Sequence, residues 1–105
     1  MPQNFEIDVA TEDGGLVVRV SGELDLTARG DLVDRAVALM TAADVTRLSI
    51  DLTQVTFCDS SGLGALLDIR RAAGDAGVEM VLRNVPPPVA RLLDLTDVDS
   101  WLTRE

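Results

Sequence analysis

The sequence contains no histidine, the side chain that most often moves protons near neutral pH. Neither a Ser-His-Asp nor a Cys-His arrangement can therefore be assembled, and no obvious base is available to activate Ser60 or the single cysteine, Cys58. A serine hydrolase that uses Ser60 is the enzymatic alternative, and the missing histidine argues against it. The sequence predicts a protein that is not an enzyme.

The residue sets that hold metals and nucleotides are missing as well. A zinc site needs several Cys or His ligands, whereas this chain has one Cys and no His. No acidic residues have the spacing of a calcium loop, and no glycine-rich phosphate-binding motif follows a predicted strand. We expect no metal site and no cofactor.

Lysine is absent too, and the basic residues total 9 against 18 acidic ones, for a net charge of -9. This charge repels nucleic acid backbones and anionic lipids. A lone cysteine cannot form an intrachain disulfide, residues 1–12 lack the pattern of a secretory signal, and no apolar run approaches the roughly 20 residues of a membrane span. We expect a cytoplasmic protein that binds neither nucleic acid nor membranes.

The residues that are present indicate one compact domain with an aliphatic core. A chain of 105 residues has the length of a single domain, which we place at 1–105. Hydrophobic residues make up 47% of the chain and aromatic residues only 3%. Val, Leu and Ala must therefore fill the interior.

Hydrophobic periodicity predicts an α/β fold. Apolar and polar residues alternate in four runs, which we expect to be strands, at 5–9, 16–20, 48–52 and 78–82. A turn at 12–15 should join the first two runs into a hairpin. Spacings of three and four residues predict helices at about 27–43, at 61–73 and from the prolines at 86–88 to Leu93. This order favours a mixed sheet with helices packed mainly on one face.

The junction between the third predicted strand and the second predicted helix is rich in hydroxyls and glycines. A helix cap is the simple explanation for this composition. One helix start needs a single capping side chain, however, and this segment contains three candidates, Asp59, Ser60 and Ser61. Gly62 and Gly64 each reduce helix propensity by ~1 kcal/mol relative to Ala. We interpret the glycines as leaving space for another backbone or a partner to approach the hydroxyls. Replacement of Gly62 by Ala should then leave folding unharmed.

Three stretches of the chain resemble the STAS domain family, and specifically the bacterial anti-sigma factor antagonists. They read S-G-E-L-D at 21–25, F-C-D-S-S-G-L-G at 57–64 and P-V-A-R-L-L-D at 88–94, in the order of the family. The D-S-S-G-L-G segment is fairly specific in this context, whereas G-E-L-D alone would be weak. The resemblance implies a single STAS-like domain.

The resemblance also implies a function in partner switching. In the family, the unphosphorylated antagonist binds an anti-sigma factor and releases a sigma factor, in stress response or sporulation. The anti-sigma factor is itself a serine kinase that phosphorylates the Ser after the Asp, here Ser60, and a serine phosphatase resets the cycle. The residues expected to contact the partner are Glu23, Asp25, Asp59, Ser61, Gly62, Leu63 and Gly64.

Other interpretations remain open at this point. Glu23 and Asp25 also fit a turn followed by a helix cap, and Leu63 fits a core position first. The chain could instead be a STAS interaction subunit of a transporter or signalling assembly, in which Ser60 is structural and unphosphorylated. If Ser60 is modified, a phosphate of about -1.5 to -2 charges beside Asp59 should weaken binding without refolding the domain.

Overall fold

The computed structural model describes residues 5–12, 14–42, 45–96 and 102–105. The elements follow the predicted order of strands and helices. They are β1 (Phe5–Glu12), β2 (Gly15–Leu24), α1 (Leu26–Ala42), β3 (Arg47–Cys58), α2 (Ser60–Ala76), β4 (Glu79–Arg83) and α3 (Pro87–Thr96). None of the helices in these ranges combines the length and the apolar character that a membrane span requires.

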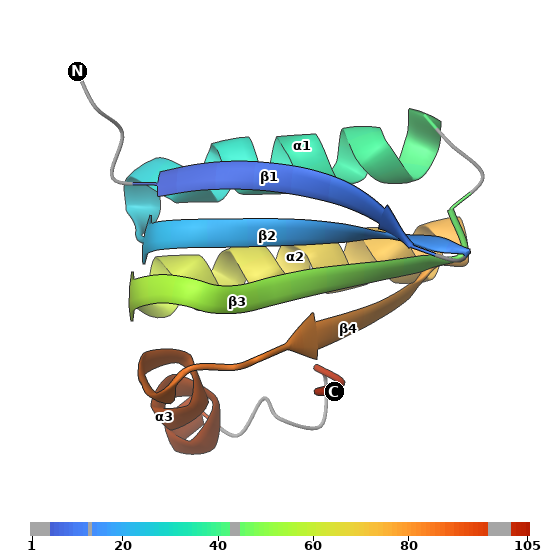
Figure 1. Ribbon diagram of the computed structural model, residues 1–105. Coiled ribbons are helices and arrows are strands. Elements are labelled where there is room, and N and C mark those ends of the chain that lie inside the picture. Colours follow the sequence, from blue (N-terminus) through green and yellow to red (C-terminus); the bar gives the residue numbers. More distant parts are fainter. Residues whose placement is uncertain (1–4, 13, 43–44, 97–101) are drawn as a thin grey trace.

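The four strands form one mixed sheet in the order β1-β2-β3-β4. β1 and β2 are the predicted antiparallel hairpin, whose turn includes Gly14 at a φ of 74°, a conformation that glycine adopts without strain. β2 pairs with β3 in parallel, as β3 does with β4. The carboxyl ends of β2 and β3 therefore meet at one edge of the sheet, on the left of Figure 1, where α1 and α2 begin.

The helices cover one face of the sheet, as predicted. Figure 1 shows α1 and α2 lying behind the strands, and α3 adds Val89 and Leu93 to the same core. That core is aliphatic, and its most deeply buried side chains include Val18, Val20, Leu48, Ile50, Leu52, Leu66, Ile69 and Leu82. The opposite face carries polar side chains, including Asp8, Arg19 and Asp51.

β1, β2, β3 and α2 extend beyond their predicted ends, and β3 does so by the most residues. The β2–β3 register shifts between Arg19, which pairs with Asp51, and Ser21, which pairs with Gln54, and it shifts again after Gly22. Such bulges break the alternation of period two, so the sequence pattern ended before the strand did. α2 continues through Gly74 and ends before Gly77, whose φ of 72° is that of a left-handed helix cap.

Candidate functional site

The start of α2 is fixed by the Asp59 carboxylate. Asp59 has extended backbone angles, and its Oδ1 accepts hydrogen bonds from the backbone N–H groups of Ser61 (2.9 Å) and Gly62 (3.1 Å). Its own N–H donates to the carbonyl of Leu24 at 3.2 Å, which ties this junction to the end of β2. The cap explanation is therefore correct for Asp59.

The start of α1 uses the same device at Asp25. Its Oδ1 accepts hydrogen bonds from the backbone N–H groups of Thr27 (3.0 Å) and Ala28 (3.3 Å) and from the Thr27 hydroxyl (2.6 Å). The Thr27 hydroxyl is the main reason that the pKa of Asp25 lies below its ordinary value, and the two backbone donors add to this against the opposing effect of burial. Asp25 is therefore a charged cap at neutral pH.

The two capped starts are neighbours because their parent strands are paired. Leu24 at the end of β2 lies opposite Cys58 at the end of β3, and Glu23 lies opposite Phe57. Ser60 is exposed at this edge, and Glu23, Asp25, Asp59 and Ser61 are half-buried there. The structure thus gathers these predicted site residues at one edge of the sheet.

Two apolar side chains at the same edge were missed in the sequence. Leu26 is 72% exposed in the first turn of α1, and Phe57 is 46% exposed near the end of β3. The available signals were local: Leu26 directly follows a capping residue, and Phe57 follows the bulged part of its strand. Both side chains lie at the edge of the sheet that also carries Ser60, Glu23 and Asp25.

Gly62 and Leu63 lie beneath this surface. A Cβ atom on Gly62 would collide with the carbonyl oxygen of Leu24, and would come within 2.8 Å of the Leu24 Cβ and 2.9 Å of the Cys58 Sγ. Of the two expected occupants of this space, another backbone is correct, since the Leu24 backbone fills it, and a partner is wrong. The expectation that Gly62→Ala leaves folding unharmed is therefore wrong as well. Leu63 is 5% exposed and belongs to the core.

Gly64 faces an arginine from the other helix. A Cβ atom there would lie 2.7 Å from Nη1 and 2.8 Å from Cζ of Arg29. Arg29 in turn pairs through Nη2 with Oδ2 of Asp68 at 2.9 Å. The space beside Gly64 is therefore occupied by a long side chain of α1 that is itself partly exposed.

The site offers no reactive nucleophile of its own at Cys58. Burial, and secondarily the charge of Asp59, raise the pKa of the Cys58 thiol to about 11, so it stays protonated at neutral pH. Among the residues described, no three His, Cys, Asp or Glu side chains lie together in a way that could hold a metal ion.

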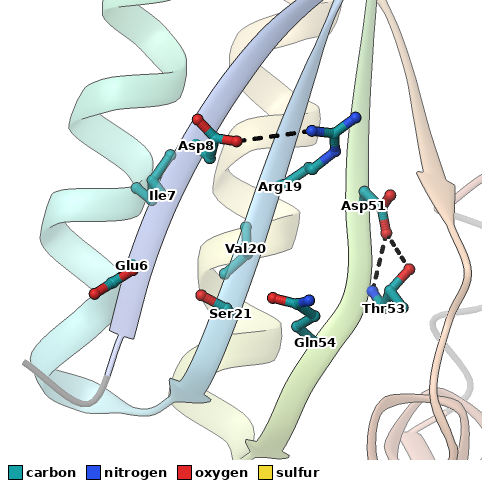
Figure 2. A pocket seen from close by; sticks show the side chains of 9 residues that line it. All are labelled: Glu6, Ile7, Asp8, Arg19, Val20, Ser21, Asp51, Thr53 and Gln54. Atoms are coloured by element: carbon teal, nitrogen blue, oxygen red, sulfur yellow. Dashed lines mark hydrogen bonds and ion pairs between the residues drawn. The ribbon is translucent and has the colours of Figure 1, made fainter.

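A second, polar hollow lies on the open face of the sheet (Figure 2). There Arg19 pairs with Asp8 at 3.7 Å, and Asp51 accepts hydrogen bonds from the N–H and hydroxyl of Thr53. Burial acts to raise the pKa of Asp51, but the bonds from Thr53 and Asn84 outweigh it and the pKa is lowered. These polar groups bind one another, so the sheet edge around Ser60 is the stronger candidate site.

The comparisons with known proteins point to one family. The model of the family described as "Mlab, STAS domain" matches residues 7–104. The anti-sigma F factor antagonist of Paenibacillus polymyxa is 33% identical over 93 residues, which cover 89% of this chain and 80% of that protein. An anti-sigma factor antagonist from Mycobacterium paratuberculosis has a crystal structure with a TM-score of 0.85 at 28% identity, covering 99% of this chain and 87% of that one.

The fold also agrees with that of SpoIIAA from Bacillus, at 22% identity. The TM-score is 0.79 for its unphosphorylated form, over 95% of this chain and 88% of that chain, and 0.71 for its phosphorylated form, over 96% and 90%. These matches define a STAS fold. The chain belongs to the STAS domain family and, within it, to the anti-sigma factor antagonists. Such antagonists are regulatory proteins and not enzymes, which confirms the prediction made from the missing histidine.

Proposed function

We propose that this chain is an antagonist switched by phosphorylation, whose unphosphorylated form binds a kinase-type anti-sigma factor and thereby releases a sigma factor. The observation that carries the proposal is the exposed Ser60 at the capped start of α2, beside a second capped helix start at Asp25. The kinase partner supplies ATP and Mg²⁺, and a serine phosphatase resets the switch. We place this cycle in the cytoplasm, in a stress or sporulation response.

Ser60 is favoured over Ser61 as the phosphoacceptor by exposure. Ser60 is the first residue of α2 and is exposed, whereas Ser61 is half-buried and its N–H is bound by the Asp59 cap. A kinase must bring its nucleotide up to the accepting hydroxyl. The exposed Ser60 meets that need with less displacement of neighbouring atoms than the half-buried Ser61.

The contact surface for the anti-sigma factor combines charge and apolar area. We assign to it the half-buried Glu23, Asp25, Asp59, Ser61 and Gly64, together with the exposed Leu26 and Phe57. Two apolar anchors flanked by carboxylates fit a partner that presents an apolar recess and arginine or lysine side chains. Gly62 and Leu63 support this surface from below.

Phosphorylation would end binding through charge. A phosphate adds about -1.5 to -2 charges at a place that already holds Asp25 and Asp59. A hundredfold loss of affinity requires only ~2.7 kcal/mol, and a poorly paired dianion in a protein interface costs at least that order. The N-terminus of α2 stabilises a phosphate by ~0.3 to 1 kcal/mol, so the fold should persist. The two solved forms of SpoIIAA support this view, since both keep the fold.

The test uses the cognate anti-sigma factor, ATP and Mg²⁺. Peptide mapping should place one phosphate on Ser60, and Ser60→Ala should abolish it while Ser61→Ala, the matched control, should not. By titration calorimetry, Ser60→Ala should bind persistently and Ser60→Asp should lose most affinity, although Asp carries only about one charge. Phosphate confined to Ser61, or phosphorylated protein that binds undiminished, would contradict the proposal. Binding with no phosphorylation at all would favour an interaction subunit of another assembly.

A further inference from the structure

Arg29 bridges the two helices next to Ser60. It lies in the first turns of α1, and its Nη2 is 2.9 Å from Oδ2 of Asp68 in α2. Its Cζ lies 2.8 Å from the point that a Cβ on Gly64 would occupy, so the guanidinium rests where α2 has no side chain. Both members of the ion pair are partly exposed, at 40% for Arg29 and 37% for Asp68.

The positions on α2 that Arg29 faces belong to one row that starts at Ser60. Ser60, Gly64 and Asp68 follow one another at intervals of four, and such residues are neighbours on a helix surface, about 6 Å apart along the axis. Arg29 lies over the middle position, Gly64, and is bonded to the acid at one end of the row. The hydroxyl at the other end is Ser60.

We propose that Arg29 is the residue that binds the phosphate on Ser60, exchanging the Asp68 carboxylate for the phosphate dianion. A guanidinium presents a planar fork of donors that matches phosphate oxygens, and a phosphate carries more charge than a carboxylate. The bare backbone of Gly64 leaves the path between the two acceptors open, because a Cβ there would come within 2.7 Å of Nη1.

This inference gives the phosphorylated state its own internal partner. It depends on the proposed function for the event that places a phosphate on Ser60. Its consequence is that part of the phosphate charge is neutralised within the chain, so that α1 and α2 are joined more firmly in the phosphorylated form than in the unphosphorylated one.

The experiment places phosphoserine at position 60 genetically and follows the phosphate by ³¹P NMR as the pH is varied. The second pKa of a phosphoserine is about 6, and a bound guanidinium lowers it. We expect Arg29→Gln to raise this pKa by about 0.5 or more relative to the parent protein. Arg35→Gln, on the exposed side of the same helix, is the matched control and should leave it nearly unchanged.

Asp68→Asn tests the exchange from the other side. With the competing carboxylate removed, Arg29 is free for the phosphate, and the phosphate pKa should fall below that of the parent protein. Most of that fall should disappear in the double variant Arg29→Gln/Asp68→Asn, because the coupling runs through Arg29. Urea unfolding of each unphosphorylated variant checks that the fold is retained.

Two outcomes would overturn the proposal: equal phosphate pKa values in the parent protein and Arg29→Gln, or equal shifts from Arg29→Gln and Arg35→Gln. Equal shifts from the two variants would show that both arginines act through the overall electrostatic field and that Arg29 makes no specific contact with the phosphate. Because the phosphoserine is installed without a kinase, a chain that no anti-sigma factor phosphorylates would contradict the proposed function and still leave the Arg29 measurement decisive.

Discussion

The starts of α1 and α2 have the same capping chemistry but differ in how deeply they are buried. Each follows the end of one of two paired parallel strands, and at each an aspartate Oδ1 accepts two backbone N–H groups. The start of α2 is pressed into the sheet, with Gly62 and Leu63 buried, whereas the start of α1 exposes Leu26 and Thr27. The Asp59 cap therefore fixes a helix start that is buried around Gly62 and Leu63 and exposes Ser60. The Asp25 cap fixes a helix start whose side chains face the solvent.

A pair of glycine substitutions should show the largest difference in stability between the two helix starts. Gly62→Ala inserts a methyl group against the Leu24 carbonyl, and overpacking of this kind costs about 1–3 kcal/mol. Gly30→Ala in α1 meets nothing within 4 Å and should raise stability by up to ~1 kcal/mol through better helix propensity. Urea unfolding midpoints measure both. A Gly62→Ala variant with the same urea midpoint as the parent protein would contradict the tight packing of the α2 start.

Removing the cap of α2 should have the next largest effect. Asp59→Ala leaves the N–H groups of Ser61 and Gly62 without their acceptor and should cost about 1 kcal/mol in the free energy of unfolding, within a range of 0.5–2. Asp59→Asn keeps an acceptor oxygen and is the matched control, with a cost of only a few tenths expected. An equal loss in the two variants would show that the charge of Asp59, and not its hydrogen bonds, holds the helix start.

The fold was predictable because local patterns encode it. Alternation of apolar and polar residues located all four strands, and the three-and-four spacing located all three helices. The ends of β1, β2, β3 and α2 were all placed too early. The reason is visible for β3, where bulges after Asp51 break the alternation, and for α2, which passes through Gly74. A glycine is only a weak helix stop, because it costs ~1 kcal/mol and packing can offset that.

The site was predictable only in part, because its geometry depends on contacts between distant segments. The hydroxyls and caps at 59–61 were visible as a local motif. The tight packing at Gly62 was not visible locally, because the Leu24 backbone that excludes a side chain there lies 38 positions earlier in the sequence. The pairing of Arg29 with Asp68 spans 39 positions and has no local signature. Sequence alone shows that a glycine is present, and only the fold shows what occupies the space beside it.

The smallest expected effect concerns the charge of the α1 cap and is read as a dependence on pH. The pKa of Asp25 is lower in the folded protein than its ordinary value, chiefly because of the Thr27 hydroxyl. A lowered pKa means that the stability contributed by the ionised group is present above about pH 4, the value in the unfolded chain, and is lost as the pH falls through the folded value. Asp25→Asn caps without titrating, and Asp51, whose pKa is also lowered, is common to both proteins and cancels. The difference in unfolding free energy between parent and variant should therefore be constant from pH 7 to 5 and shift in favour of the variant as the pH falls below about 4, the pKa in the unfolded chain. A difference that does not change with pH would show that Asp25 stabilises the start of α1 through hydrogen-bond geometry alone and that its charge contributes nothing.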